Sequence, residues 1–311
     1  MMSGRKNSKK KKKSIKAWAL SLAALLLLIS QASFAQSQIK QYQKHTKIGG
    51  SLDTTILIVG WTADDASIHR LLELLVTKST EAFNLLNWQN PYGETAKVNA
   101  NAGNGPVVVS GITLGAFQAY KKIAEWTSGN FDLNYGNAGS YRDVKINDRK
   151  STIELKKSGM QIRFDNMLEG FLADLIIRYI HSANMNSAMA KVGNIFRGMG
   201  SSMHGPWRIQ VEDDAGMFAH HALKLTVKNT GIATISGNQF RSKPLINPQT
   251  KQTMAPTCKG TTVVMNEAAF AQGLAFAVFV LGPEKGMKLL KKYGKGLIVD
   301  NQGKFLRSPG F

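Results

Sequence analysis

Residues 271–282 read AQGLAFAVFVLG, and this apolar stretch decides the fold class. It is too long for a single buried strand, and we predict a helix near Glu267–Val280 followed by a second helix at Pro283–Tyr293. A β-branched strand is predicted just before them, at Thr261–Met265, and another after them, at Leu297–Asp300. Helices bounded closely by strands indicate a protein that mixes the two kinds of element.

The rest of the chain repeats this mixture in an irregular order. Strands are predicted at 54–60, 106–110, 152–155, 161–164, 207–211, 223–227 and 232–236, and helices after the capping pair at 64–65, at 114–126 and at 167–180. The Asn- and Gly-rich residues 87–105 predict a loop. Residues 193–205 (GNIFRGMGSSMHG) lack the spacing of a phosphate-binding loop, so we expect a flexible loop there. Without regular βα alternation, an α+β fold with mixed or antiparallel sheets fits best.

Composition limits the class of protein before any motif is considered. The 311 residues are 43% hydrophobic and 19% charged, which is typical of a globular chain. Cys258 is the single cysteine, so an intramolecular disulfide and a cysteine-based zinc or iron–sulfur site are excluded. No internal repeat or Pro/Ser-rich linker divides the sequence, and we predict one domain over residues 36–311.

The first 35 residues have the pattern of a secretory signal. Residues 5–16 carry eight lysines and arginines and no acid, and an apolar run, AWALSLAALLLLI, follows at 17–29. Two small residues with one residue between them, Ser33 and Ala35, then predict cleavage after Ala35. The apolar run is short for a membrane span, although an uncleaved anchor stays an alternative. With no cysteine near the start we expect no lipoprotein, and we expect export to the periplasm or cell envelope.

The formal charge of +20 is partly due to this segment. Without its eight cations the chain keeps 32 Lys and Arg against 20 Asp and Glu, a charge of +12. A basic surface of this kind suits phosphate-bearing ligands, acidic partners or an anionic envelope surface. The lysine run lies directly before a leucine-rich stretch, so we expect no nucleic-acid partner.

Seven segments, in one order along the chain, resemble motifs of the ApbE family, the FAD:protein FMN transferases. They are Lys97–Ala100 with Pro106–Ser110, Thr127–Asp132, Glu169–Asp174, Pro206–Ile209, Ser236–Gly237, Ile246–Thr250 and Ala271–Gly282. The resemblance implies an exported α+β domain of duplicated T-fold type. It also implies an activity in which FAD is cleaved and FMN is attached to a threonine of a partner protein, with Mg²⁺ stabilising charge on the pyrophosphate.

The two positions that match the family's metal ligands, an Asp and a Thr, hold Gln272 and Phe276 here. A glutamine offers a neutral carbonyl oxygen, but phenylalanine offers nothing to a hard cation. We therefore predict that no metal site remains, and that Mg²⁺ is not a cofactor. FAD stays a possible ligand.

Other family positions divide into retained and substituted ones. Retained are Gly170, Asp174, Gly193 and Gly237. Substituted are Asn166 (after Asp165) for a paired glycine, Glu169 for a lysine, Pro244 for a histidine and Asn247 for an aspartate. All eight are candidate cofactor-binding positions. Proline cannot transfer a proton, and a glutamate beside a pyrophosphate repels it.

Three functions follow from these observations. The first is a catalytically degenerate member of the family that acts as a binding or accessory module with an envelope or membrane-associated protein partner. The second is an active FAD:protein FMN transferase with a rebuilt site. The third is a carrier of flavin or another phosphorylated ligand without turnover.

Overall fold

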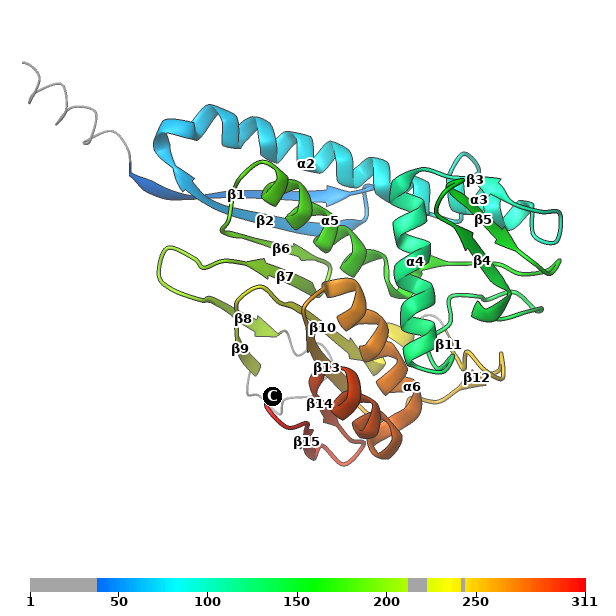
Figure 1. The fold of residues 1–311 in the computed structure, drawn as a ribbon. Helices are drawn as coiled ribbons and strands as arrows, with labels where there is room; N and C mark the ends of the chain where they lie inside the picture. Colours follow the sequence, from blue (N-terminus) through cyan, green and yellow to red (C-terminus); the bar gives the residue numbers. More distant parts are fainter. Residues whose placement is uncertain (1–37, 212–222, 242–243) are drawn as a thin grey trace, which may run out of the picture.

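An antiparallel sheet of eight strands runs through the molecule (Figure 1). The computed structural model describes residues 38–211, 223–241 and 244–311. The strand order is β1-β2-β6-β7-β10-β13-β14-β15. Their bounds are β1 (Ile39–Ile48), β2 (Leu52–Trp61), β6 (Ala188–Val192), β7 (Ile195–Met199), β10 (Gly231–Ser236), β13 (Gly260–Met265), β14 (Lys295–Val299) and β15 (Phe305–Arg307). This confirms the predicted α+β class with antiparallel pairing.

Three helices cover one face of this sheet. They are α2 (Asp65–Leu86) over β1 and β2, α5 (Leu168–Ser182) over β6 and β7, and α6 (Ala268–Tyr293) over β10 and β13. Strand alternation explains the contact, because Ile56 and Ile58 of β2 are fully buried in the core beneath the helices.

The opposite face of the sheet carries a smaller cluster. Leu57 points there, between Ile56 and Ile58, and packs with Trp207 and Ile209. The latter two belong to a separate antiparallel pair of strands, β8 (Trp207–Val211) and β9 (Leu223–Val227). Both strands were predicted, and the pair shields the central sheet from solvent.

A small sheet lies beyond the C-terminal end of α2 in Figure 1. Its order is β3-β5-β4, and its elements are β3 (Val107–Val108), β4 (Val144–Asn147) and β5 (Thr152–Leu155), flanked by α3 (Glu94–Ala100) and α4 (Gly111–Trp126). Ser110 caps α4 through its Oγ, which accepts the Thr113 N–H at 3.4 Å. One hydrophobic core runs from this end to α6.

Helix α6 is broken near its middle. Gly282 has φ +76°, a left-handed conformation that favours glycine, and Pro283 follows it. The helix therefore consists of the two helical segments that the sequence predicted. No helix in the described ranges is long and apolar enough to cross a bilayer.

Several predicted elements were wrong. Residues 161–164 form no strand: Ile162 pairs its N–H and C=O with the side chain of Asn99, both at 2.8 Å. The flexible loop expected at 193–205 contains strand β7, and the loop expected at 87–105 contains helix α3. The predicted signal segment, residues 1–35, lies outside the described residues.

Candidate functional site

The start of α5 lies against the start of α6, and a glycine permits this contact. A Cβ on Gly170 would lie 2.6 Å from the carbonyl oxygen of Ala268, so any larger residue would separate the helices. The Gly170 N–H donates to Oε1 of Gln272 at 2.8 Å. Gly170 therefore allows Gln272, at the position matched to a family metal ligand, to contact α5 directly.

Asp174, one turn further along α5, holds the first residues of α6. Its two carboxylate oxygens accept the N–H groups of Ala268 at 2.9 Å and Ala269 at 2.8 Å, and Arg197 Nε donates to it at 3.0 Å. A carboxylate at a helix N-terminus satisfies amides that have no partner within the helix. Burial raises the pKa of Asp174 to about 6. This retained residue therefore has a structural task in this chain.

Glu169 and Gln272, two substituted positions 103 residues apart, touch. Gln272 Nε2 donates to Glu169 Oε2 at 2.6 Å, while its Oε1 accepts from Gly170. Gly193, in the turn between β6 and β7 with φ +55°, lies beside them: a Cβ there would be 3.4 Å from Cγ of Glu169. Four family positions thus meet at one point, and the amide of Gln272 is engaged at both ends.

Phe276, one turn after Gln272 on α6, lies in an aromatic cluster formed by Phe131, Phe240, Phe276 and Phe279. The Phe276 ring is 2% exposed, and its centroid lies 5.9 Å from that of Phe131 and 6.2 Å from that of Phe240, both edge to face. Phe240 stacks on Phe279 at 5.5 Å. Edge-to-face rings of this kind attract one another beyond simple burial.

A small cavity of about 140 Å³ adjoins this aromatic cluster. It brings together three substituted family positions, Asn166, Pro244 and Phe276, with Tyr135 among its other lining residues. Asn166 Nδ2 donates to the Tyr135 hydroxyl. Pockets for small molecules usually enclose about 300–1,000 Å³, so this one is too small for a flavin in the described conformation.

Gly237 and Asn247 do not meet the other candidates. The Gly237 N–H donates to the carbonyl of Lys259 at 3.0 Å. Asn247 Oδ1 accepts the N–H of Gln249 at 2.9 Å, which shapes the turn between β11 (Leu245–Ile246) and β12 (Thr253–Met254). The Gly237 bond extends the pairing of β10 with β13, and the Asn247 bond belongs to a turn.

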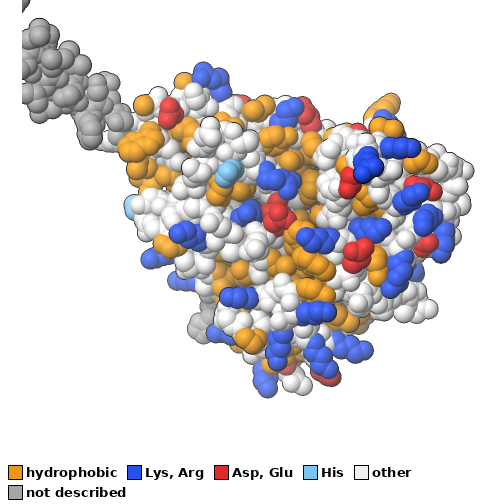
Figure 2. Space-filling view, viewed as in Figure 1, with side chains coloured by type: hydrophobic (Ala, Val, Ile, Leu, Met, Phe, Trp, Pro, Cys, Tyr) orange, Lys and Arg blue, Asp and Glu red, His pale blue; other side chains and the backbone are white. Residues whose placement is uncertain are grey.

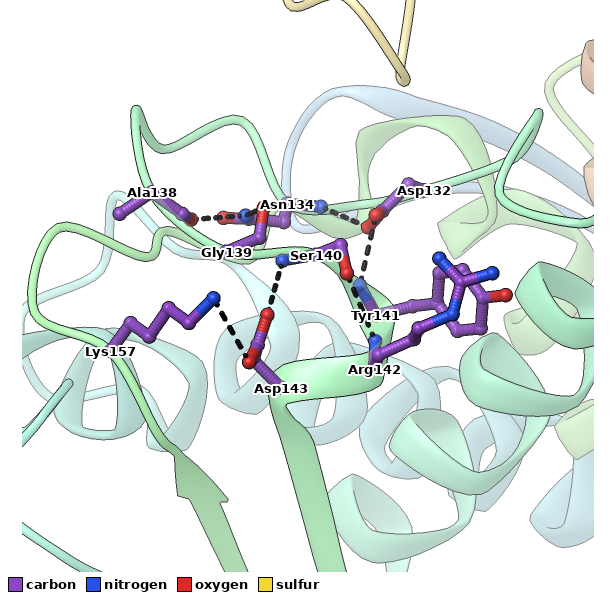
Figure 3. Close-up of polar contacts among 9 residues, drawn as sticks. All are labelled: Asp132, Asn134, Ala138, Gly139, Ser140, Tyr141, Arg142, Asp143 and Lys157. Atoms are coloured by element: carbon purple, nitrogen blue, oxygen red, sulfur yellow. Dashed lines mark hydrogen bonds and ion pairs between the residues drawn. The ribbon is translucent and has the colours of Figure 1, made fainter.

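A polar loop at residues 132–143 (Figure 3) directly follows Phe131 of the aromatic cluster along the chain. Asp132 accepts from the Tyr120 hydroxyl at 2.5 Å and from the N–H groups of Asn134 and Tyr141 at 2.9 Å each. Asn134 Nδ2 donates to the carbonyls of Ala138 and Gly139, at 2.7 and 3.0 Å. Both side chains are buried. Their hydrogen bonds fix a loop that has little regular structure of its own.

A larger cavity, of about 720 Å³, lies on the other side of Tyr135. Trp88, Asn99 and Gln161 are among the residues that line it, all neutral. The Arg163 guanidinium lies 4.1 Å from the Trp88 ring and 5.4 Å from the Tyr135 ring. Sequence reasoning missed Trp88, Tyr135 and Arg163, although an aromatic residue in an Asn-rich loop was a signal that could have found Trp88.

The residues at the start of α6 do not fit a Mg²⁺ ion. Mg²⁺ takes oxygen ligands in near-octahedral geometry. Here Phe276 presents a buried ring, the Gln272 amide is engaged by Gly170 and Glu169, and both Asp174 oxygens accept backbone amides. Among the described residues, no three His, Cys, Asp or Glu side chains gather into a group that could hold a metal.

The fold is that of a class of known structures, described as flavin transferases. It superposes on the apo flavinyl transferase ApbE of Pseudomonas stutzeri with a TM-score of 0.73 at 17% identity, covering 88% of this chain and 96% of that one. For the flavin transferase ApbE of Vibrio cholerae the TM-score is 0.71 at 18% identity, covering 88% and 99%.

Sequence comparison then identifies the family. A family model described as the ApbE family matches residues 52–299, so the chain belongs to the ApbE family. The FAD:protein FMN transferase of Treponema pallidum is 22% identical over 322 aligned positions, covering 89% of this chain and 88% of that protein. The FAD:protein FMN transferase of Vibrio cholerae is 22% identical over 306 positions, covering 87% and 89%. The predicted resemblance is confirmed.

Proposed function

We propose that this chain is an exported ApbE-family protein that has lost Mg²⁺-dependent FMN transfer and acts as a binding or accessory module for an envelope protein. The observation that carries the proposal is the burial of Phe276 in the aromatic cluster, at the position of a family metal ligand. A ring that is 2% exposed and in contact with two other rings offers no oxygen ligand to a cation.

The charge beside this position also opposes FMN transfer. Where the family has a lysine, Glu169 accepts from Gln272 and lies beside the Gly193 turn. A pyrophosphate at this turn would meet a carboxylate rather than a cation. Like charges about 4 Å apart repel by about 1 kcal/mol in water, and by more where they are partly buried.

The third supporting observation concerns proton transfer. Pro244 lines the 140 Å³ cavity where the family has a histidine. FMN transfer requires the acceptor hydroxyl to lose its proton as its oxygen attacks the FMN phosphorus and AMP leaves. Proline has no group that can take this proton, and no histidine in the described part of the chain lines the cavity.

The test is an FMN-transfer assay with the protein, FAD, Mg²⁺ and a threonine-bearing acceptor protein that the Vibrio cholerae transferase modifies in a parallel reaction. Covalent flavin is read as fluorescence of the acceptor band after denaturing electrophoresis. We expect none above a reaction without enzyme. Mg²⁺-dependent labelling of the acceptor by this chain would establish the alternative, an active transferase with a rebuilt site.

A flavin carrier without turnover is a second candidate, and the 720 Å³ cavity favours it. Its volume lies in the range of small-molecule pockets, and Trp88 and Tyr135 offer aromatic surfaces to a planar ring. A carrier predicts saturable FAD binding that Mg²⁺ does not change. Replacing Trp88 by Ala weakens such binding, whereas Tyr92→Ala, on a nearby side chain that is 84% exposed, leaves it unchanged.

Export and cleavage complete the proposal. The basic and apolar order of residues 5–35 supports them, and the mature protein is expected to begin at Gln36. N-terminal sequencing of the protein from the periplasmic fraction tests this. Recovery of intact Met1 in the membrane fraction would favour an uncleaved anchor.

A further inference from the structure

An open groove crosses the face of the molecule between α4 and the starts of α5 and α6, and Asp174 is the one candidate position among its described lining residues. It has two halves, of about 490 and 610 Å³, which share Lys122, Glu267 and Phe270. Figure 2 shows hydrophobic side chains gathered along this part of the surface, with Lys and Arg around them.

The 610 Å³ half of the groove has an aromatic surface. The ring of Trp126 stacks on that of Tyr293 at 5.4 Å and lies 5.1 Å from that of Phe270. Lys122 Nζ lies 5.1 Å from the Trp126 ring and 5.2 Å from the Phe270 ring. All three rings are partly exposed, so they present apolar area to a ligand. Aromatic side chains of this kind are enriched in protein interfaces.

The 490 Å³ half is bordered by small residues of α4. Gly111, Gly115 and Ala119 recur every four residues and so lie on one side of the helix. A Cβ on Gly111 or Gly115 would have no neighbour within 4 Å. Glycine in a helix interior is destabilising relative to alanine, and packing within this chain does not require it at 115. The absent side chains leave room for a second backbone to approach closely.

The charges that line the groove favour an acidic partner. Lys122, Arg178 and Lys295 line it, and Arg178 lies over the ring of Phe171. Glu267 is the exposed acid among the lining residues, since Asp174 is buried and paired with Arg197. A net positive groove favours acidic partners and disfavours both a second copy of this basic chain and its own lysine-rich residues 5–16.

We propose that this groove binds an acidic amphipathic helix of a partner protein. The apolar face of that helix lies on the Gly111–Gly115–Ala119 strip, a larger apolar side chain contacts Trp126, and glutamates or aspartates on its flanks meet Lys122, Arg178 and Lys295. Helix-in-groove binding is a common mode of recognition. The inference rests on the proposed binding role and specifies the partner's chemistry.

The probe is a synthetic, fluorescein-labelled helical peptide of about three heptads, with Ala and Leu on one face and Glu on both flanks. Binding to the protein is measured by fluorescence anisotropy at low salt. Two control peptides are used, one with every Glu replaced by Lys and one with the same acidic composition in scrambled order. We expect saturable binding of the acidic amphipathic peptide and at least about tenfold weaker binding of both controls.

Two variants test whether the peptide binds in the groove. Gly115→Leu places a side chain on the open strip, where a Cβ has no neighbour within 4 Å, and we expect it to weaken binding at least about tenfold. Lys122→Glu reverses a lining charge and is expected to weaken binding about fivefold. Lys304→Glu, an equal charge change on an exposed residue outside the groove, should leave binding unchanged. Circular dichroism confirms that each variant is folded.

Absence of binding, equal binding of a control peptide, or binding that Gly115→Leu leaves intact each overturns the inference. Its failure can be separated from failure of the proposed loss of activity. A chain that transfers FMN and still binds the peptide refutes the loss of activity alone. A chain that does neither refutes the groove alone.

Discussion

The polar loop and the aromatic cluster meet at the consecutive residues Phe131 and Asp132 and differ in what their side chains do. In the polar loop, Asp132 and Asn134 each make several hydrogen bonds that fix the backbone. In the aromatic cluster, Phe276 occupies a family ligand position and makes ring contacts. The comparison separates buried polar side chains that hold a loop by hydrogen bonds from a buried ring that packs in the core. Under the proposed function, the second kind stands where the family has a metal ligand.

The largest expected effect comes from the aromatic cluster. Phe276→Ala removes a buried ring and leaves a cavity, which should lower the free energy of unfolding by about 3–5 kcal/mol. Phe276→Thr, which restores the family residue, should cost nearly as much because the ring contacts are lost. Urea unfolding followed by circular dichroism measures both. A loss below about 1 kcal/mol would show that Phe276 is not a core residue.

The polar loop should show a somewhat smaller effect. Asp132→Ala leaves the Tyr120 hydroxyl and the N–H groups of Asn134 and Tyr141 without their acceptor, at a cost of about 2–3 kcal/mol. Asp132→Asn keeps one acceptor oxygen and should cost less. The same unfolding experiment gives both values, and equal stability of the Ala variant and wild type would contradict the role of the loop.

Asp174 gives a prediction about pH. Burial raises its pKa from 3.8 to about 6, so the folded state keeps a proton that the unfolded chain loses between these values. The contribution of this carboxyl to the free energy of unfolding is therefore greatest below pH 3.8. It falls by about 2–3 kcal/mol as the pH rises to and through 6. The stability difference between wild type and Asp174→Asn should shrink from pH 4.5 to 7.5. A constant or growing difference would contradict the assignment.

The smallest effect concerns charge at the substituted positions. Glu169→Gln keeps an oxygen for the Gln272 amide and removes the negative charge. If FAD reaches this point, its dissociation constant should fall about fivefold, which corresponds to about 1 kcal/mol. Glu284→Gln, on an exposed position of α6, serves as the control. Weaker FAD binding by Glu169→Gln would mean that the carboxylate assists the ligand.

The sequence supported much of the fold because its elements have local signals. Ser110 marks the start of α4, and Gly282-Pro283 marks the break in α6. Strand β1 was missed because most of its residues are exposed and polar, and β7 was missed because glycine and methionine surround it. Residues 161–164 have a strand-like composition, but the Asn99 side chain takes the hydrogen bonds that a neighbouring strand would have made.

The candidate site was less accessible from sequence. Family resemblance marked Glu169 and Gln272 separately, yet their contact depends on the approach of α5 and α6 at Gly170. The ring partners of Phe276, Phe131 and Phe240, come from two distant segments of the chain, so no local pattern could place them together. Asp174 was assigned to the cofactor by resemblance, whereas its observed partners are the first amides of α6 and Arg197. Whether any of these positions binds a cofactor stays a prediction.

The most direct test of the central claim, that the start of α6 no longer holds Mg²⁺, is an FAD titration of the protein by flavin fluorescence with and without Mg²⁺. The Vibrio cholerae transferase serves as a reference measured under the same conditions. If FAD binds, we predict that Mg²⁺ changes the dissociation constant by less than about twofold. If FAD does not bind alone, we predict that it does not bind with Mg²⁺ either. Tightening by about tenfold or more on addition of Mg²⁺ would contradict the account.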